Sequence, residues 1–314
     1  MRAFVLSIFL CSLAAALAAP APAEPRDGPS PLSARQSLGG AAPRPSRPLG
    51  QGALRALNPA STSARGRGGA CLFQPKRRAM RDADLAKRAV GFAAVDRYVR
   101  AGTCIGLGSG TTAFWAIERV GERIRGGDDI VAVATSSVTE RLCRERGIPL
   151  IAFGEREIAV AIDGADEVAA DWSLTKGGGG ALFREKAIAL AAQTFVVIVT
   201  PEKLVQRLGA FRTPVEVVPF SQGWVEHAIR TSFGAAAVRR GGDTPYLTDN
   251  GNVLLDCSFG SIADPAALDA QLRAIHGVVA TGLFYDLTDA VLVNDSRGGV
   301  EMLTRLGGTR PGTA

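Results

Sequence analysis

The sequence predicts an α/β protein with a mostly parallel, Rossmann-like sheet and an inserted small α+β domain of ferredoxin-like type. Short apolar runs alternate with amphipathic helical segments between residues 82 and 200, a rhythm typical of parallel strands joined by crossover helices. Between residues 208 and 280 this rhythm gives way to short strand-like runs and two helical segments. Apolar runs then return, which indicates that the chain comes back to its first sheet.

The larger domain is expected over residues 80–207 and 281–306. Asp82 is a candidate helix cap, and the apolar positions after it recur at helical spacing as far as Arg100. Further helices are expected over residues 111–125, 138–146 and 181–193. Strands are expected over residues 103–107, 129–134, 149–153, 158–163 and 195–200.

The small domain is expected over residues 208–280. Its strands are placed at 215–219, 236–239, 246–248 and 253–257, and its helices at 225–231 and 265–275. The run Asp249-Asn250-Gly251-Asn252 is a strong hairpin turn signal. The runs 278–284 and 290–294 are expected to rejoin the first sheet, and the tail 307–314 is expected to be disordered.

The charge of the chain is unevenly distributed. The formal net charge is +6, but residues 1–81 carry twelve Lys and Arg against two acidic residues. The remaining chain carries 24 basic against 28 acidic residues. A nucleic-acid binder needs its positive charge on the folded face that meets phosphate, so the sequence argues against that class.

The basic N-terminal segment has the composition of a targeting leader. Residues 1–18 combine a basic start, an apolar run and an Ala-Leu-Ala exit, which predicts a signal peptide. Residues 19–79 are rich in Arg, Pro and Ser and resemble a disordered transit peptide. Signal plus transit resembles the bipartite leaders of plastids of secondary origin, so we expect a plastid (chloroplast stroma). The alternatives are a disordered linker in a protein of the secretory pathway and an uncleaved membrane anchor; after leader removal no stable membrane association is expected.

Cysteines and histidines are few. Cys104, Cys143 and Cys257 are the cysteines that lie outside the leader, an odd number without framework spacing, which fits a reducing compartment. His227 and His276 are the two histidines, and no pair of residues has metal-ligand spacing. We therefore expect no metal site.

Residues 106–112 (Gly-Leu-Gly-Ser-Gly-Thr-Thr) form a glycine-rich segment between a predicted strand and a predicted helix. Gly108 and Gly110 would let the backbone close on an anion, and the hydroxyls of Ser109, Thr111 and Thr112 would add donors. The spacing is not that of the dinucleotide fingerprint. Phosphate binding and a plain tight turn both remain open at this point.

Two further segments carry ionisable groups. The first is Asp163-Gly-Ala-Asp166-Glu167, at the end of a predicted strand, where open α/β sheets bind ligands. A solvated acidic turn would have the same sequence pattern. Lys176 then precedes four glycines, Gly177, Gly178, Gly179 and Gly180, which permit close approach of the backbone to a ligand. Lys176 is also a candidate cation for the three carboxylates.

Six strings together carry a specific resemblance: GLGSGTTA, TSSVTERL, IDGADEV, KGGGGALFREK, TDNGNVLLDC and GVVATGLF. In this order and at near-family spacing they closely resemble type A ribose-5-phosphate isomerase over residues 82–306. The resemblance implies conversion of ribose 5-phosphate to ribulose 5-phosphate through an enediolate, with no metal or organic cofactor. That reaction serves the pentose phosphate pathway or the Calvin cycle. The family also suggests a homodimer or homotetramer.

The resemblance assigns roles to named residues. Glu185 resembles the base for carbon, Lys176 the oxyanion stabiliser, Asp163 the group that opens the sugar ring and relays hydroxyl protons, and Asp166 its support. Phosphate contacts would come from Ser109, Thr111, Thr112, Lys87 and Lys203, although either lysine could equally be a solvated helix residue.

Two other classes share parts of this pattern. Sugar-phosphate sensor modules share the sheet and the phosphate loop, but they usually carry a DNA-binding helical domain. Amino-sugar phosphate deaminase-isomerases have a related fold and use a catalytic histidine. Neither His227 nor His276 lies in a motif, so we expect both to be structural.

Overall fold

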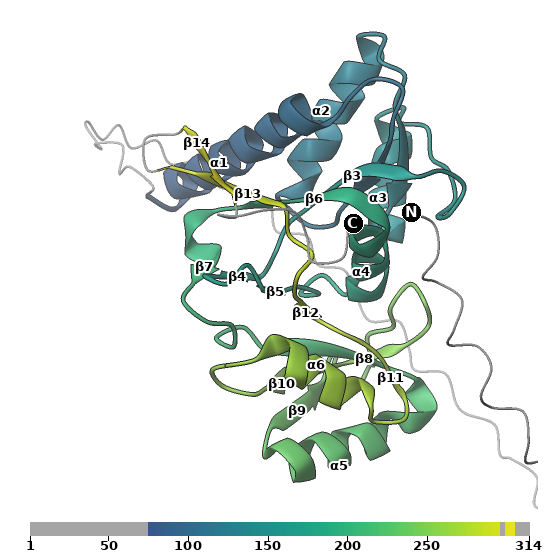
Figure 1. The fold of residues 1–314 in the computed structure, drawn as a ribbon, viewed down its shortest axis with the longest axis vertical. Helices are drawn as coiled ribbons and strands as arrows, with labels where there is room; N and C mark the ends of the chain where they lie inside the picture. Colours follow the sequence, from purple (N-terminus) through teal and green to yellow (C-terminus); the bar gives the residue numbers. More distant parts are fainter. Residues whose placement is uncertain (1–74, 296–298, 305–314) are drawn as a thin grey trace, which may run out of the picture. The chain divides into compact units, whose positions relative to one another are not determined.

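The structure, a computed structural model, describes residues 75–295 and 299–304. A six-stranded sheet with the order β14-β13-β6-β3-β1-β2 lies within the larger domain, the upper part of the structure in Figure 1. Neighbouring strands are parallel except β13 and β14, which are antiparallel. The strands are β1 (Cys104–Leu107), β2 (Val131–Ala134), β3 (Ile158–Asp163), β6 (Ala192–Val199), β13 (Ala290–Asn294) and β14 (Val300–Thr304). The expected α/β fold with a mostly parallel sheet is confirmed.

Helices cover both faces of this sheet. Side chains along a strand point alternately to the two faces. Val196 and Ile198 of β6 therefore pack with α1 (Pro75–Tyr98) and α2 (Ala113–Arg125), and α3 (Ser137–Glu145) completes that layer. Phe195, Val197 and Val199 pack with α4 (Leu182–Ala191) on the opposite face. Burial on both faces explains why these strands read as continuous apolar runs.

The small domain is a four-stranded antiparallel sheet with two helices. Its order is β11-β8-β10-β9, and the chain runs strand, helix, strand, strand, helix, strand, which is the ferredoxin-like arrangement. Val215, Leu255 and Ile229 share its core. The elements are β8 (Thr213–Val217), α5 (Gln222–Phe233), β9 (Ala236–Arg239), β10 (Val253–Ser258), α6 (Pro265–Arg273) and β11 (Val278–Thr281).

A third sheet, not expected from the sequence, lies where the two domains join. Its order is β12-β5-β4-β7, with β12 (Leu283–Phe284), β5 (Leu174–Thr175), β4 (Glu167–Ala169) and β7 (Leu204–Val205). Strands of two or three residues are too short to show a period in the sequence. Two single turns of 3-10 helix, η1 (Pro201–Lys203) and η2 (Pro219–Ser221), complete the described elements.

Two predicted strands and the expected sheet of a third segment are wrong. Residues 278–284 do not rejoin the first sheet: β11 pairs with β8 in the small domain, and β12 pairs with β5. Residues 149–153 form a single bridge to β2 through Leu150, and residues 246–248 form a single bridge through Leu247. In each case local apolar character suggested a strand, but the available partner edges decided the pairing.

The start of α1 also differs from the expectation. The helix begins at Pro75, so Asp82 lies inside it and does not cap it. Proline suits the first position of a helix, and the Lys, Arg, Ala and Met residues that follow favour helix formation. The helix extends into residues 75–79, which were assigned to the leader. The rest of the predicted signal and transit segments and the predicted tail 307–314 lie outside the described residues.

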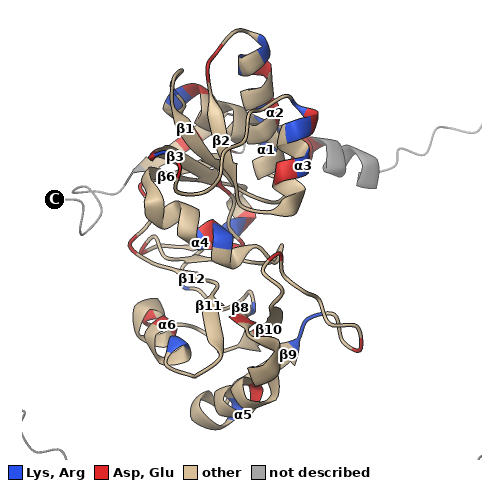
Figure 2. Ribbon diagram, turned by 90° about the vertical axis from the view of Figure 1, so that its right-hand side faces the viewer, with Lys and Arg blue, Asp and Glu red and all other residues tan. Residues whose placement is uncertain are grey.

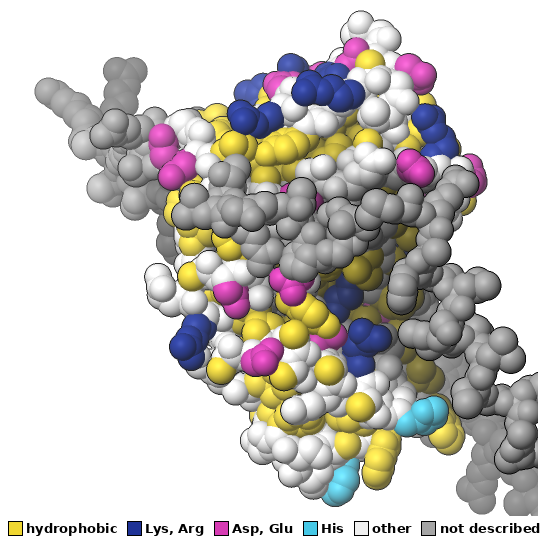
Figure 3. Space-filling view, viewed as in Figure 1, with side chains coloured by type: hydrophobic (Ala, Val, Ile, Leu, Met, Phe, Trp, Pro, Cys, Tyr) yellow, Lys and Arg dark blue, Asp and Glu magenta, His cyan; other side chains and the backbone are white. Residues whose placement is uncertain are grey.

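The surface of the described part carries mixed charge. Lys and Arg are interspersed with Asp and Glu along the helices (Figure 2). Histidine side chains are visible on the small domain (Figure 3), and both His227 and His276 are exposed. Within residues 75–295 and 299–304, no helix combines the length and apolar character needed to cross a bilayer.

Candidate active site

The chemistry-bearing segments meet at the carboxyl edge of the parallel sheet. The glycine-rich loop follows β1, Asp163 ends β3, and Thr200 follows β6. Parallel strands bring these ends together, and an open α/β sheet binds its ligands there. Lys176 follows β5, and Glu185 lies in the first turn of α4. The topology thus gathers groups that are up to a hundred residues apart in the chain.

Lys176 lies between two carboxylates in the interior. Its Nζ atom is 2.9 Å from Oδ2 of Asp163 and 3.3 Å from Oε2 of Glu185. The same ammonium donates a hydrogen bond of 2.6 Å to the carbonyl of Gly164. Asp163, Lys176 and Glu185 expose 4%, 3% and 5% of their side chains. One buried cation therefore faces two buried carboxylates. Removing three charged groups from water has a high desolvation cost, which points to a functional role for the cluster.

Burial raises the pKa of both carboxyls. It raises the pKa of Glu185 to about 7, against the opposing effect of Lys176. It also raises the pKa of Asp163 above its ordinary value, although Lys176 and the backbone N–H groups of Gly164 and Ser109 lower it. For Lys176, burial alone would lower the pKa, but the charges of Asp163 and Glu185 raise it above the ordinary value. The site thus combines a base that titrates near neutral pH with a permanent cation.

Asp166 anchors the glycine loop that follows Lys176. Its Oδ2 atom accepts a hydrogen bond of 2.7 Å from the backbone N–H of Gly178. A Cβ at Gly178 would lie 2.6 Å from Oδ1 of the same carboxylate, so a side chain there would displace Asp166. The loop therefore needs glycine at this position to approach Asp166 closely.

Gly108 makes room for Asp163. A Cβ at Gly108 would lie 2.0 Å from Oδ1 of Asp163 and 2.1 Å from its Cγ. The same Oδ1 atom accepts a hydrogen bond of 3.1 Å from the N–H of Ser109 and one of 2.7 Å from Gly164. The end of β1 and the end of β3 thus pass at a distance that no residue with a side chain permits.

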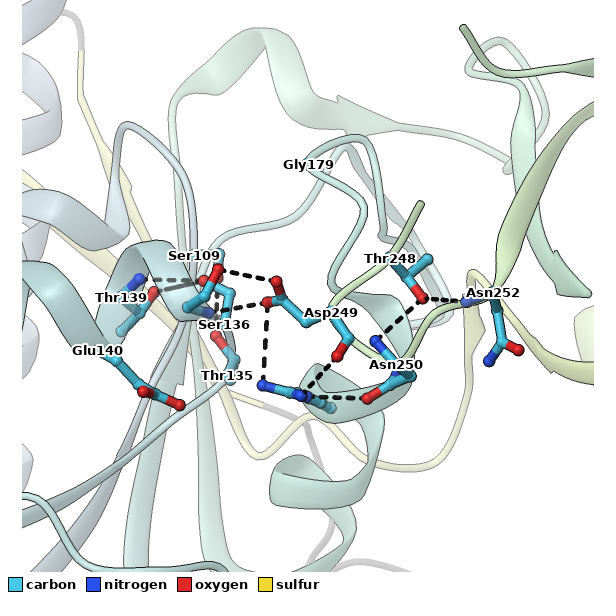
Figure 4. A network of polar contacts seen from close by, with 12 residues as sticks. Ser109, Thr135, Ser136, Thr139, Glu140, Gly179, Thr248, Asp249, Asn250 and Asn252 are labelled. Carbon is cyan, nitrogen blue, oxygen red and sulfur yellow. Dashed lines mark hydrogen bonds and ion pairs between the residues drawn. The ribbon is translucent and has the colours of Figure 1, made fainter. Parts of the chain in front are cut away.

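The Ser109 hydroxyl belongs to a cluster of four hydroxyl groups (Figure 4). It lies 2.8 Å from Thr135, donates at 2.8 Å to Ser136, and lies 3.1 Å from Thr139. Thr139 donates to the carbonyl of Gly108 at 2.9 Å. These contacts fasten the glycine-rich loop to the start of α3, and the expected phosphate contact of Ser109, which lines the cavity, stays a prediction.

A cavity of about 320 Å³ opens over these groups. It brings together residues of α1, the glycine-rich loop, the loop after β5, α4 and η1. The expected residues that line it are Lys87, Ser109, Gly110, Thr111, Thr112, Asp166, Lys176, Gly177, Gly178, Gly179, Glu185 and Lys203. Of the expected set, only Gly108 and Asp163 are absent from the lining, and these two residues lie against each other.

Sequence reasoning missed several residues around this cavity. Thr200 and Glu202 line it, and Thr200 donates a short hydrogen bond to Glu202. Partial burial raises the pKa of Glu202, but this bond and the charges of Lys203 and Lys87 lower it below its ordinary value. The position of Thr200 directly after an apolar strand was a usable signal.

Arg240 and Tyr246 of the small domain hold the glycine loop from outside. Arg240 donates to the carbonyls of Gly177 and Gly178 at 3.0 and 3.2 Å, and it forms an ion pair with Asp256. The Tyr246 hydroxyl donates to the carbonyl of Gly179 at 3.3 Å. No motif marks either residue, because their contacts depend on the packing of the two domains.

A second cavity, of about 580 Å³, lies beside the 248–252 turn and α4, and it is lined by Phe153, Phe183 and Arg184 among others. It is larger, but its lining lacks the buried Lys176 and Glu185, so the smaller cavity is the candidate site. In the ranges that the structure describes, no group of three or more His, Cys, Asp or Glu side chains is arranged to hold a metal ion.

Comparison with known proteins agrees with this geometry. The family model of ribose 5-phosphate isomerase A (phosphoriboisomerase A) matches residues 131–298. Ribose-5-phosphate isomerase A 1 of Oceanobacillus iheyensis is 44% identical over 218 residues, which cover 69% of this chain and 97% of that protein. The chain belongs to the ribose 5-phosphate isomerase A family. The resemblance inferred from the six strings is thereby confirmed.

Solved structures of the ribose 5-phosphate isomerase A family have the same fold. The enzyme of Methanocaldococcus jannaschii superposes with a TM-score of 0.67 at 39% identity, covering 71% of this chain and 99% of that one. A D-ribose-5-phosphate isomerase in complex with phospho-erythronic acid superposes with a TM-score of 0.68 at 36% identity, covering 71% and 99%. Both domains described above therefore belong to the architecture of the family.

Proposed function

We propose that this chain interconverts D-ribose 5-phosphate and D-ribulose 5-phosphate as an aldose–ketose isomerase. The observation that carries the proposal is the buried Lys176 between Asp163 and Glu185, beside a cavity that two further lysines line. An aldose–ketose shift needs a base for carbon, a positive charge near the developing oxyanion and a group that moves hydroxyl protons. The three buried groups supply these needs.

Glu185 is the base in this mechanism. Its carboxylate takes the proton from carbon 2 of the open-chain aldose, and the C–H electron pair becomes the double bond between carbons 1 and 2. The carbonyl electrons move to oxygen 1, where the Lys176 ammonium stabilises the negative charge. Glu185 returns the proton to carbon 1, the hydroxyl proton of oxygen 2 passes to oxygen 1, and the ketose results.

Asp163 moves the hydroxyl protons. Burial raises its pKa above the ordinary value, and its contact with Lys176 places it beside the same oxygens. The same group would open the furanose ring. Its carboxylate takes the proton of the carbon-1 hydroxyl, the bond between carbon 1 and the ring oxygen breaks as the carbonyl forms, and the proton is returned to the former ring oxygen, which becomes the carbon-4 hydroxyl. Asp166 fixes the backbone of Gly178 and so supports the wall of the cavity.

The phosphate would bind at the other side of the cavity. Lys87 and Lys203 supply positive charge there, and Thr111 and Thr112 line the cavity at the start of α2, the positive end of the helix dipole. The related structure with phospho-erythronic acid, a phosphorylated sugar acid, supports a substrate of this class. Binding energy from the phosphate would hold carbon 2 against Glu185.

Assay of the purified full chain with ribose 5-phosphate and with glucosamine 6-phosphate tests the proposal. We expect ketose from ribose 5-phosphate and no ammonia from glucosamine 6-phosphate. An amino-sugar phosphate deaminase-isomerase would need a catalytic histidine in the site. His227 and His276 are instead exposed on the small domain and do not line the cavity. Release of ammonia without ketose formation from ribose 5-phosphate would overturn the assignment.

We further propose that the enzyme works in a plastid, and as a homodimer or homotetramer. The composition of residues 1–79 supports the first proposal, and the family supports the second. A fluorescent reporter fused to residues 1–79 should accumulate in the plastid, and accumulation in the medium would favour the secretory alternative. Sedimentation of the purified protein measures its oligomeric state, and a monomer would contradict the second proposal.

A further inference from the structure

The two residues that flank Glu185 both reach the small domain. Arg184 and Lys186 leave α4 on either side of Glu185, and each ends on a different element of that domain. Arg184 meets the turn over residues 248–252, between β9 and β10, and Lys186 meets Asp269 of α6. The small domain therefore contacts α4 at the positions immediately before and after the base.

Arg184 makes a forked contact with the 248–252 turn. Its Nε atom donates to Oδ1 of Asn250 at 3.0 Å, and its Nη2 atom donates to the carbonyl of Asp249 at 3.0 Å. The carboxylate of Asp249 lies 3.9 Å from Nη1. A planar guanidinium can satisfy two acceptors at once only in one orientation, so this contact fixes the direction of the side chain.

The same turn also holds α3. The carboxylate of Asp249 accepts from the N–H and from the hydroxyl of Ser137, both at 2.8 Å. Ser137 is the first residue of α3, next to Ser136 of the hydroxyl cluster that fastens the glycine-rich loop (Figure 4). The turn thus touches the starts of both α3 and α4, and α4 carries Glu185 into the lining of the substrate cavity.

A buried carboxylate makes the 248–252 turn rigid. Glu216 of β8 is fully buried, and its Oε1 atom accepts from Thr248 at 2.9 Å, from Asn250 at 3.2 Å and from Asn252 at 2.9 Å. Three donors on one oxygen hold the turn against the core of the small domain. Arg184 is therefore tied to the small domain's sheet through a turn with little freedom.

Lys186 provides the second contact. Its Nζ atom lies 3.4 Å from Oδ1 of Asp269, which is 1% exposed and also accepts from Thr281 and Tyr285. The ammonium lies 5.1 Å from the centre of the Phe284 ring. This contact is deep in the protein, whereas the Arg184 contact is partly exposed.

The carboxylate of Glu185 has little to hold it otherwise. Its buried Oε2 atom lies 3.3 Å from Lys176 but accepts no hydrogen bond from the described residues. Its position relative to Lys176 therefore follows the position of the α4 backbone. A displacement of about 1 Å in a catalytic group can cost about a hundredfold in rate.

We propose that Arg184 and Lys186 are positioning residues, through which the small domain holds the Glu185 carboxylate against Lys176. This inference rests on the proposed function for its kinetic consequences, but not for the geometry it describes. It assigns the small domain a part in catalysis, although its described residues supply neither the base nor the buried cation.

The test compares Arg184→Ala with wild type in the full chain. We expect the kcat for ribose 5-phosphate to fall at least about tenfold, while KM changes less than about twofold, because the phosphate contacts are untouched. Arg184→Lys, which keeps the charge and loses the fork, should recover part of the loss. Asp249→Asn should stay near wild type, because its amide can still meet both groups of Ser137.

The pKa of Glu185 distinguishes a positioning role of Arg184 from a contribution to stability alone. The charges of Lys176, Asp163 and Asp166 act on Glu185, and Tyr246 of the small domain also interacts with it. Among these groups Lys176 lowers the pKa of Glu185. If α4 shifts so that Glu185 stays buried but moves away from Lys176, it keeps the burial that raises its pKa and loses the cation that lowers it, so its pKa rises. Carbon-13 NMR of the Glu185 carboxyl, assigned with Glu185→Gln, should show a higher pKa in Arg184→Ala. This measurement holds whether or not the chain isomerises ribose 5-phosphate, so failure of the proposed function is seen separately in the wild-type assay.

Arg119→Ala is the matched control. The Arg119 side chain is as exposed as that of Arg184, 32% against 33%, and it makes two ion pairs, with Asp96 and Glu122. We expect the Arg119→Ala enzyme to have the kcat and the Glu185 pKa of wild type.

A second variant tests the other contact. Lys186→Met, which keeps the apolar stem, should raise the pKa of Glu185 as Arg184→Ala does. An unchanged pKa of Glu185 in both Arg184→Ala and Lys186→Met would overturn the proposal, even if both variants melt earlier.

Discussion

The Nζ atom of Lys176 lies 3.3 Å from Oε2 of Glu185, and both side chains are almost completely buried. Two effects on Glu185 oppose each other here. Burial disfavours its ionised form, and the neighbouring cation favours it; the balance places the pKa of Glu185 at about 7. A carboxyl with this pKa is a much stronger base than an exposed glutamate, and it is still ionised in a useful fraction at neutral pH.

Glu185→Gln tests the base. The amide keeps the shape of the side chain but cannot take a proton from carbon, and general-base catalysis is worth about 10²–10⁴ in rate. We expect kcat to fall by that factor, with little change in substrate affinity. Exchange of the carbon-2 proton of ribose 5-phosphate with solvent, followed by NMR, should slow in parallel.

Glu226→Gln, the same substitution on α5 of the small domain, is the control and should keep wild-type turnover. A Glu185→Gln enzyme that retained a tenth of wild-type turnover and exchange would show that another group takes the carbon-bound proton. Asp163 would then be the first candidate, because it contacts the same ammonium.

The pH dependence of turnover follows from the same pKa. Glu185 acts as a base in its ionised form, so kcat should rise with pH through about 7 and then level off. Lys176 causes no change in kcat near neutral pH, because its pKa is raised above its ordinary value and its ammonium stays charged. The measurement is kcat for ribose 5-phosphate between pH 5 and pH 9, roughly two units on either side of the Glu185 pKa. A profile that stays flat across neutral pH would contradict the assignment of this limb to Glu185.

Much of the site was predictable because its residues lie in contiguous segments. Asp163 ends an apolar strand and Lys176 precedes four glycines, so sequence order alone placed both at one edge of the sheet. The roles of Glu185, Lys87 and Lys203 came from the family resemblance, since periodicity does not distinguish a catalytic side chain from a structural one on the same helix.

What the sequence could not predict depends on contacts between the domains. The third sheet uses strands of two or three residues, too short to show a pattern, and Arg240 and Tyr246 reach the glycine loop only because the small domain packs beside it. Ser109 shows a related limit. The sequence gives no sign that three hydroxyls near the start of α3 lie around the Ser109 hydroxyl, and its predicted phosphate contact stays a prediction.

The phosphate should matter for rate as well as for affinity. If Lys87, Lys203 and the start of α2 hold it, ribose without phosphate loses the energy that places carbon 2 against Glu185. We expect kcat for ribose to be a small fraction of kcat for ribose 5-phosphate, even at saturation. Equal turnover of the two sugars would remove the phosphate site from the mechanism.

Replacement of Lys203 tests its contribution to phosphate binding. A charge-assisted hydrogen bond is worth about 1.5–3 kcal/mol, so Lys203→Met should raise KM for ribose 5-phosphate by at least about tenfold. Inorganic phosphate should inhibit this variant more weakly by a similar factor. Lys203→Met with unchanged KM and phosphate inhibition would show that Lys203 is a solvated helix residue.

Gly108→Ala tests whether Asp163 must lie where it does. The new Cβ would fall 2.0 Å from Oδ1 of Asp163, so the carboxylate or the end of β1 has to move, and the 2.9 Å contact between Asp163 and Lys176 should lengthen. Overpacking of this kind costs about 1–3 kcal/mol of unfolding free energy, and a displacement near 1 Å costs about a hundredfold in turnover. We therefore expect kcat to fall about a hundredfold at a temperature where the variant is still fully folded, so that unfolding does not account for the loss.

Gly223→Ala on α5 is the control. Apart from the helix's own backbone and the chain neighbours, no atom lies within 4 Å of its Cβ position, and alanine is favourable in a helix. Wild-type turnover in a folded Gly108→Ala enzyme would mean that Asp163 can shift without penalty, and its contact with Lys176 would then be structural.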